Sequence, residues 1–432
     1  MARDNIISSI DIGTSKITTL VASIDEEGIA HILGVSTVPS RGLRKGQVVN
    51  IDEATSAISS SIDAAERMSG SSVGRAVISI GGSHIASLNS HGVVAVSDPE
   101  KEITESDLHR VIDAAKAVSL PSSREILHVL PRGYIVDGQE GIVDPISMTG
   151  VRLEVDTHLV TGGATAIRNL YKCVEELGVE IVSVAFSGYA SSFACLSDTE
   201  KELGVVLVDI GGGTTDVAIF VEGALSYSSV IPVGAINISK DLAAGLRVSL
   251  ESAEKIKLFL GRTPKLPVMS PDHDEKSRRR NLLLDDLDIS SLMLPEEIRS
   301  VSQKTLVEGI IKPRLNEIFT MVGLEIKRSG FGGLTPSGVV ITGGGAMTVG
   351  AVDCAKKNLV MPVRIGTPLH ITGLIDEILT PAFCTSVGLL LYSVKDKESE
   401  SESRFGGFKK FGGIQIKGLA GKVVDLVKSL LP

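Results

Sequence analysis

Apolar residues along this chain occur in short strand-like runs that alternate with helical stretches. The runs 6–10 and 17–24 flank a turn of Gly, Thr and Ser, and the runs 204–208 and 217–221 flank a second turn of the same kind. Each pair of runs predicts a β-hairpin. Between them, residues 51–68 carry apolar positions three and four apart, which is the pattern of a helix packed on a core.

The same plan of strands and helices occurs twice, and each half contains an inserted block with a different pattern. The first block has short strands and one helix, and a helix over 161–177 is predicted to follow it. The predicted parts are a first-lobe core of residues 1–81 and 161–202, an inserted small subdomain of 82–160, a second-lobe core of 203–234 and 301–394, a small subdomain of 235–300, a flexible linker of 395–413 and a terminal amphipathic helix of 414–432.

The turns of the two hairpins are rich in groups that bind anions. The first turn offers Gly13, Thr14, Ser15 and Lys16, and the second offers Gly211, Gly212, Gly213, Thr214 and Thr215. Glycine lets the main chain approach an anion, and successive N–H groups form an anion-binding concavity. Asp11 and Asp209, just before the turns, suit Mg²⁺ bound through its waters. Two such hairpins could hold a polyphosphate from both sides, with Lys16 as a counter-charge.

A third loop accompanies the hairpins. The apolar run 339–342 ends in Gly343, Gly344, Gly345 and Ala346, before a stretch of helical character. A glycine-rich turn between a strand and a helix suits close approach of the backbone to a nucleotide. The order of the loops along the chain, two phosphate-binding loops followed by an adenosine-binding loop, resembles that of the actin-like ATPase superfamily. This superfamily has an α/β, ribonuclease H-like fold with two lobes around a nucleotide cleft.

Several runs between these loops narrow the resemblance. Residues 39–42, 127–131, 138–142, 186–192, 200–204, 363–368 and 371–374 are similar to the FtsA family of bacterial cell-division proteins. The resemblance implies ATP and Mg²⁺ as ligands and an inserted subdomain that serves self-assembly into filaments. It also implies ribose contacts from Glu254 and Lys257.

The resemblance further implies a partner. Residues 299–319 correspond to the region that in this family receives the C-terminal peptide of the tubulin-like division protein FtsZ. That peptide is acidic and apolar in the family, so Arg299, Lys304 and Arg314 are the candidate counter-charges. Later division proteins are expected as additional partners.

Catalysis is predicted to be weak or absent. Hydrolysis needs a group that orients or deprotonates the attacking water. Chaperones and actin place a Glu or Gln before the second phosphate loop, whereas residues 185–188 here carry no carboxylate or amide. Asp209 and Asp216 are the candidate catalytic residues, and Thr215 is a further group that could position water.

The C-terminal residues supply a separate signal. A charged and Gly-rich stretch precedes a segment with one apolar stripe and basic residues elsewhere, which is typical of a helix lying on an anionic membrane surface. The predicted membrane contacts are Ile416, Leu419, Val423, Leu426, Val427 and Leu430, with Lys417, Lys422 and Lys428. Docking of this segment on the chain itself, or on a partner, is the alternative.

Composition sets the remaining limits. The chain has 432 residues, 43% of them hydrophobic, and a net charge of −9, which argues against a nucleic-acid partner. Four cysteines without metal-ligand spacing indicate reduced thiols in the cytoplasm. The favoured interpretation is an ATP-binding protein on the cytoplasmic face of the membrane at the septum, anchoring the FtsZ ring. A pilus-assembly type of actin-like scaffold and a small-molecule kinase of the same superfamily are the alternatives.

Overall fold

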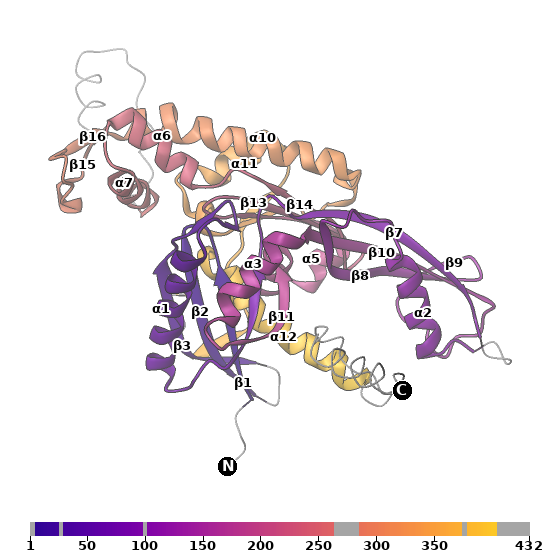
Figure 1. The fold of residues 1–432 in the computed structure, drawn as a ribbon. Coiled ribbons are helices and arrows are strands. Elements are labelled where there is room, and N and C mark those ends of the chain that lie inside the picture. The colour runs from indigo at the N-terminus through magenta and orange to yellow at the C-terminus, as the bar shows by residue number, and fades with distance from the viewer. Residues whose placement is uncertain (1–4, 26–28, 98–101, 263–284, 374–377, 404–432) are drawn as a thin grey trace, which may run out of the picture. The chain divides into compact units, whose positions relative to one another are not determined.

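The structure of this chain is a computed structural model, which describes residues 5–25, 29–97, 102–262, 285–373 and 378–403. The chain divides into two units, residues 1–393 and 394–432. Within the described ranges, the first unit contains a six-stranded, a five-stranded and a four-stranded sheet (Figure 1). The first two of these sheets each contain one of the predicted hairpins.

The six-stranded sheet has the strand order β11-β6-β1-β2-β3-β19. Its strands are β1 (Asn5–Ile12), β2 (Lys16–Ile24), β3 (Ala30–Pro39), β6 (Arg75–Ile80), β11 (Glu180–Phe186) and β19 (Ile371–Gly373). Strands β1 and β2 pair antiparallel, which confirms the first hairpin. Strand β19 pairs with β3, although the sequence assigns residues 301–394 to the second lobe. The pairing satisfies backbone groups that an edge strand would leave open.

Helices cover one face of this sheet. They are α1 (Ile51–Ser69), which contacts β2 and β3, and α3 (Ala164–Glu175), which contacts α1 and β11. Helix α1 begins where the Asn50 side chain accepts a hydrogen bond from the Glu53 N–H, and it ends at Gly70 with a φ of 70°. The short hairpin of β4 (Leu43–Arg44) and β5 (Gln47–Val48) precedes it.

The inserted block forms the four-stranded sheet, in the order β7-β10-β8-β9. Its elements are β7 (Ala86–Ala95), α2 (Glu105–Lys116), β8 (Arg124–Val136), β9 (Gln139–Ile142) and β10 (Arg152–Gly163). Val111 and Ala115 of α2 pack with Leu153 and Val155 of β10 in a core of their own. Because β10 runs on to Gly163, the helix predicted over 161–177 is shorter than expected and begins at Ala164. The apolar positions over 167–174 lie on one helix, as predicted, but Gly162 and Gly163 end a strand.

The five-stranded sheet has the order β14-β13-β12-β17-β18. Its strands are β12 (Val205–Ile210), β13 (Thr215–Val221), β14 (Ala224–Ile231), β17 (Val339–Thr342) and β18 (Val363–Ile365). All six residues of β12 are buried, because β13 and β17 flank it and helices cover the sheet. Strands β12 and β13 pair antiparallel, which confirms the second hairpin.

The helices of this half pack on the same core. They are α6 (Ile236–Leu246), α7 (Leu250–Arg262), α9 (Gln303–Leu306) with a π-helical continuation (Val307–Ile311), α10 (Lys312–Ser329) and α11 (Ala351–Leu359). Short elements complete it: β15 (Asp286–Asp288), β16 (Ser300–Ser302) and the 3-10 turns η1 (Ser290–Leu292), η3 (Gly332–Leu334), η4 (Gly344–Met347) and η5 (Pro381–Phe383). Figure 1 shows α10 and α11 side by side along this half.

Two helices, α4 (Ser187–Cys195) and α5 (Asp198–Leu203), connect β11 to β12, and α12 (Cys384–Ser403) follows η5. The backbone of residues 395–403 is helical, so the predicted linker of 395–413 is wrong over this part. A helix already nucleated at its buried start extends at little cost through Lys and Glu, which are good helix formers. Residues 404–432 lie outside the described ranges.

Candidate functional site

The turns of the two long hairpins face each other in the folded chain. We call residues 13–15 and 211–214 the twin turns. A Cβ added at Gly212 would lie 2.6 Å from Ser15 Oγ, and one at Gly213 would lie 2.8 Å from Thr14 Oγ1. The residues predicted to bind phosphate from opposite sides are therefore brought together, and only glycine leaves room for the approach.

Each twin turn follows a buried carboxylate at the end of the preceding strand. Asp11 accepts a hydrogen bond from Ser79 Oγ at 2.9 Å. Asp209 Oδ2 accepts hydrogen bonds from Ser191 Oγ at 2.6 Å and Thr385 Oγ1 at 3.1 Å. Asp216 lies directly opposite Asp209 in the β12–β13 pairing. The sequence predicted the three carboxylates, but their hydroxyl partners come from other segments and were missed.

Burial dominates the electrostatics of this cluster. It raises the pKa of Asp209 to about 6, and the neighbouring Asp11 charge acts in the same direction. Burial and the charges of Asp209 and Asp11 hold the pKa of Asp216 well above its usual value, and burial also raises the pKa of Asp11. The pKa of Lys16 is lowered by burial, with both Asp11 and Asp209 opposing that change. These shifts disfavour the ionised carboxylates, and a bound cation would favour them.

The residues present fit a magnesium ion bound through water. Carboxylate oxygens are the ligands this ion prefers, and it keeps several of its waters. The buried Oδ1 of Asp216 has no hydrogen-bond partner among the described residues. Over the same ranges, no three His, Cys, Asp or Glu side chains converge closely enough to hold a metal directly. A water-mediated site at Asp11 and Asp209 stays a prediction.

Lys16 begins β2 directly after the first twin turn. Its Nζ lies 3.9 Å from the centre of the Phe383 ring, in the 3-10 turn before α12. A cation over an aromatic face is stabilised without being neutralised. The ammonium therefore keeps its charge available for an anion.

The glycine-rich loop after β17 touches the same site. Gly343 has a φ of 80°, and a Cβ there would overlap Asp209 Oδ1. Gly345 is buried, and a Cβ there would collide with the Ile210 side chain. Gly344 and Ala346 lie with Gly345 in the 3-10 turn η4. The predicted adenosine loop thus packs against the strand that carries Asp209.

The predicted ribose contacts are on α7, and they contact each other. Lys257 Nζ donates to Glu254 Oε2 at 2.7 Å and to Ser239 Oγ at 3.0 Å, and Ser239 also donates to Glu254. Lys257 is buried, whereas the Glu254 side chain is 42% exposed. Glu254 is thus the one of the two with an open carboxylate face, and the ribose role of both stays a prediction.

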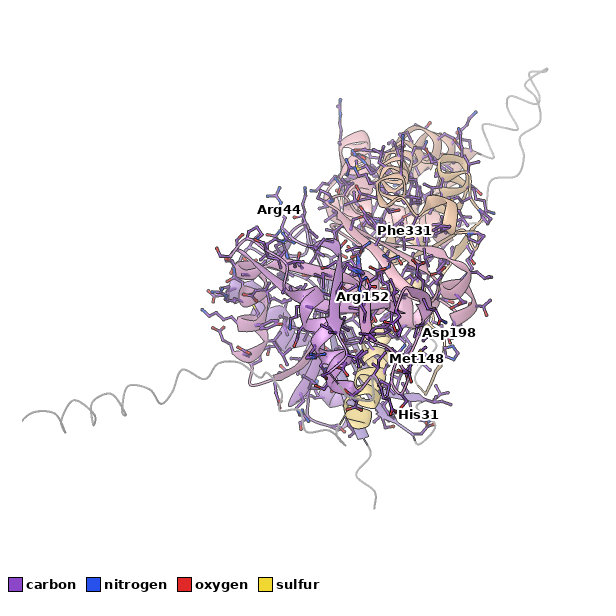
Figure 2. The ribbon with its side chains drawn as sticks, turned by 90° about the vertical axis from the view of Figure 1, so that its right-hand side faces the viewer. His31, Arg44, Met148, Arg152, Asp198 and Phe331 are labelled. Atoms are coloured by element: carbon purple, nitrogen blue, oxygen red, sulfur yellow. The ribbon has the colours of Figure 1, made fainter. Side chains whose placement is uncertain are left out.

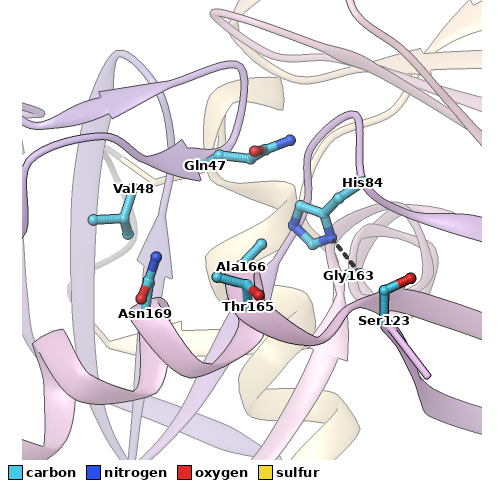
Figure 3. A pocket seen from close by; sticks show the side chains of 8 residues that line it. All are labelled: Gln47, Val48, His84, Ser123, Gly163, Thr165, Ala166 and Asn169. Carbon is cyan, nitrogen blue, oxygen red and sulfur yellow. Dashed lines mark hydrogen bonds between the residues drawn. The ribbon is translucent and has the colours of Figure 1, made fainter.

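A pocket of about 260 Å³, which no sequence pattern predicted, lies in the first lobe. It is lined by Gln47, Val48, His84, Ser123, Gly163, Thr165, Ala166 and Asn169, with His84 Nδ1 accepting from the Gly163 N–H (Figure 3). The hairpin β4–β5 adjoins it. Arg44 of this hairpin points outward (Figure 2), and the Gly46 N–H donates to Thr14 Oγ1 at 2.9 Å. The pocket is therefore linked to the first twin turn through one hydrogen bond.

The predicted partner-binding residues lie in or beside β16, α9 and α10. Arg314 forms a two-bond ion pair with Asp241 at 2.6 and 2.9 Å and also pairs with Glu317, so its charge is already compensated. Arg299 precedes β16, and Lys304 is in α9.

The predicted membrane contacts at 416–430 fall outside the described residues. Among the described helices, none has both the length and the apolar character needed to cross a membrane.

Comparison with known protein families matches two parts of the chain. Residues 82–161 match a family described as "SHS2 domain inserted in FTSA", and residues 206–388 match one described as "Cell division protein FtsA". The protein named cell division protein FtsA in Pseudomonas aeruginosa is 40% identical over 407 residues, covering 92% of this chain and 91% of that protein. The Bacillus subtilis protein of the same name is 38% identical, covering 95% and 88%.

Solved structures of lower sequence identity share the fold. The PilM–PilN type IV pilus biogenesis complex matches with a TM-score of 0.62 at 15% identity, covering 90% of this chain and 98% of that chain. MreB 5 of Spiroplasma citri bound to AMPPNP matches with a TM-score of 0.52 at 13% identity, covering 92% and 99%. The α/β actin-like fold of two lobes is thereby confirmed for the described part of the chain.

Proposed function

The chain belongs to the FtsA family of cell-division proteins, and from that premise we propose that it binds ATP with Mg²⁺ between the twin turns and assembles at the membrane during division. One observation supports the nucleotide site above all others. The twin turns meet with Gly212 against Ser15 and Gly213 against Thr14, while three buried carboxylates lie behind them. A triphosphate with its cation suits this combination of backbone donors and negative charge.

We assign separate roles to the residues of the site. The N–H and hydroxyl groups of the twin turns and Lys16 bind the phosphates, Asp11 and Asp209 orient the waters of the ion, and the 343–346 loop contacts the base. Glu254, positioned by Lys257, contacts the ribose. Bound Mg²⁺ supplies the positive charge that offsets the phosphate oxygens.

We propose that ATP acts mainly as a ligand for conformation and assembly. Residues 185–188 lack the carboxylate or amide that would position water, and Asp216 is a buried carboxyl with a raised pKa. Asp209 and Asp216 are the groups that could assist slow hydrolysis. Rapid turnover of ATP by the purified chain would contradict this part of the proposal.

We further propose that the protein forms filaments on the cytoplasmic face of the membrane and anchors the FtsZ ring, recruiting later division proteins. We assign self-assembly to the inserted subdomain of residues 82–160 and contact with anionic lipid to residues 414–432. Arg299 and Lys304 are the favoured counter-charges for the FtsZ peptide, since Arg314 is already paired. The likeness to PilM at 15% identity concerns the fold, so no pilus function is proposed.

Electron microscopy on lipid monolayers tests the assembly proposal. With ATP, Mg²⁺ and anionic lipid, we expect ordered filaments, and without nucleotide we expect fewer or none. Binding of FtsZ C-terminal peptide to the purified chain tests the partner. Filaments that form equally well without nucleotide would contradict the proposed role of ATP in assembly. A peptide that does not bind would contradict the proposed FtsZ contact.

A further inference from the structure

Two helices from distant parts of the chain cross directly beside Asp209. Helix α4 follows β11, and α12 begins about 190 residues later. A Cβ at Gly388 of α12 would overlap the Ala190 carbonyl of α4, so the two backbones are in direct contact. Such an approach is possible only because residue 388 has no side chain. The crossing fixes the first turn of α12 beside the middle of α4.

Each of these helices donates one hydroxyl to the same carboxylate oxygen. Ser191 of α4 lies 2.6 Å and Thr385 of α12 lies 3.1 Å from Asp209 Oδ2, and the two hydroxyl oxygens are 3.0 Å apart. Ser191 is fully buried, and Asp209 is 6% exposed. Each hydroxyl has one proton, so when both donate to Asp209 Oδ2 neither can donate to the other.

The arrangement gives the two oxygens of Asp209 different surroundings. Oδ2 is held by two donors, whereas Oδ1 faces the Gly343 turn, where a Cβ would overlap it. Fixed second partners orient a carboxylate and strengthen its interaction with a cation or the cation's waters. Rotation of the Asp209 side chain would break both hydroxyl contacts.

We propose that the Ser191–Thr385 pair is a positioning device for Asp209 and that it links the cation site to the crossing of α4 and α12. The inference rests on the proposed nucleotide and Mg²⁺ site. Neither hydroxyl contacts the ion. Each holds the carboxylate that orients the ion's waters, and each does so from a different helix.

The test compares four variants of the full chain. Ser191→Ala removes one donor, Thr385→Val removes the other with little change in shape, and Thr385→Ser retains it. Ser192→Ala is the matched control, because this buried neighbour donates to the Tyr189 carbonyl at 2.7 Å and not to Asp209. The readout is binding of a fluorescent ATP analogue, titrated with Mg²⁺ and repeated in EDTA.

We expect Ser191→Ala and Thr385→Val each to raise the half-saturating Mg²⁺ concentration by roughly tenfold, as is typical when a second partner of a metal-site group is lost. Thr385→Ser and Ser192→Ala should stay within about twofold of the wild type, and binding in EDTA should be unchanged in every variant. A purely structural role would lower binding with and without Mg²⁺ alike.

The outcomes separate the inference from the function it rests on. If the wild type binds no nucleotide, or binds it without Mg²⁺ dependence, the proposed site is wrong. If Ser191→Ala and Thr385→Val have the same half-saturating Mg²⁺ concentration as the wild type, the positioning role is wrong. Should Ser191→Ala fail to fold, Thr385→Val decides, because valine keeps the shape of threonine.

Discussion

Asp209 illustrates how a single buried residue combines a cost with a function. Its carboxyl is almost completely enclosed, and that burial raises its pKa to about 6 from the usual 3.8. The ionised form is therefore unfavourable in the protein without a cation. At the proposed site, a bound cation would stabilise the ionised form and recover this free energy as affinity.

Asp209→Asn should raise the stability of the nucleotide-free, Mg²⁺-free protein near neutral pH. The folded pKa lies above the unfolded one, so the wild type loses stability from this group as pH rises from about 4 to about 6. A shift of this size corresponds to on the order of 3 kcal/mol. Urea unfolding in EDTA between pH 4 and 7 measures it, and a gap between variant and wild type that stays constant with pH would contradict the assignment.

Gly343→Ala should cost roughly 1–3 kcal/mol and weaken nucleotide binding. Residue 343 has a φ of 80°, and its added Cβ would overlap Asp209 Oδ1. Gly344→Ala is the control for stability, since its Cβ would meet only Ala382 at 4.0 Å. Thermal unfolding of both variants tests the close packing, and equal losses of stability at the two positions would refute it.

The sequence predicted the individual carboxylates and glycines of the site, but not the side chains that position the carboxylates. Asp11 and Asp209 precede Gly-rich turns, which is a local pattern. Ser79 and Thr385 reach those carboxylates from 68 and 176 residues away, and hydroxyls at such distances carry no sequence signal. The pocket at Gln47 and His84 was missed for the same reason.

The sequence predicts helices and strands well where a single hydrophobic period dominates, and it predicts their ends poorly. The helix predicted over residues 51–68 matches α1 to within one residue, because its apolar positions recur regularly along one face. Thr161–Gly163 were assigned to a helix, yet they continue β10, whose pairing with β8 and β7 outweighs the local pattern. Residues 395–403 were assigned to a linker on composition, although Lys and Glu extend a helix that is already formed.

Gly388→Ala tests the contact between α4 and α12. Alanine in a helix interior normally adds up to about 1 kcal/mol over glycine. Here the added Cβ would overlap the Ala190 carbonyl, so we expect a loss of about 1–3 kcal/mol instead. Gly323→Ala in α10 is the matched control, because its Cβ would meet Leu359 Cδ2 at an ordinary 3.5 Å. Chemical denaturation of both variants should give opposite signs, and a stabilised Gly388→Ala would show that the helices do not touch.

In the first unit, the inserted sheet connects the two halves of the fold. It follows β6 of the six-stranded sheet, yet its polar side chains bond to β14 of the five-stranded sheet. Ser87 donates to the Ser228 carbonyl at 2.6 Å, and His158 Nε2 lies 2.9 Å from Ser228 Oγ. Burial lowers the pKa of His158 to about 3, so the imidazole is neutral in this contact. The lobes are thus joined by hydrogen bonds as well as by the chain.

Deletion of the chain after Gly413 should release the protein from anionic vesicles while leaving ATP binding unchanged. The removed segment carries the apolar stripe and the three lysines, each of which contributes about 1 kcal/mol near an anionic surface. Sedimentation with anionic and with uncharged vesicles measures the attachment. A truncated chain that still pellets with anionic vesicles would place the lipid contact elsewhere.

Calorimetric titration of ATP with Mg²⁺ into the full chain, alongside Asp209→Ala, decides whether the twin turns form a nucleotide site. We expect a saturable heat with one nucleotide per wild-type chain, and its loss or strong weakening in the variant. No saturable heat from the wild type, or identical curves for the two proteins, would contradict the proposal.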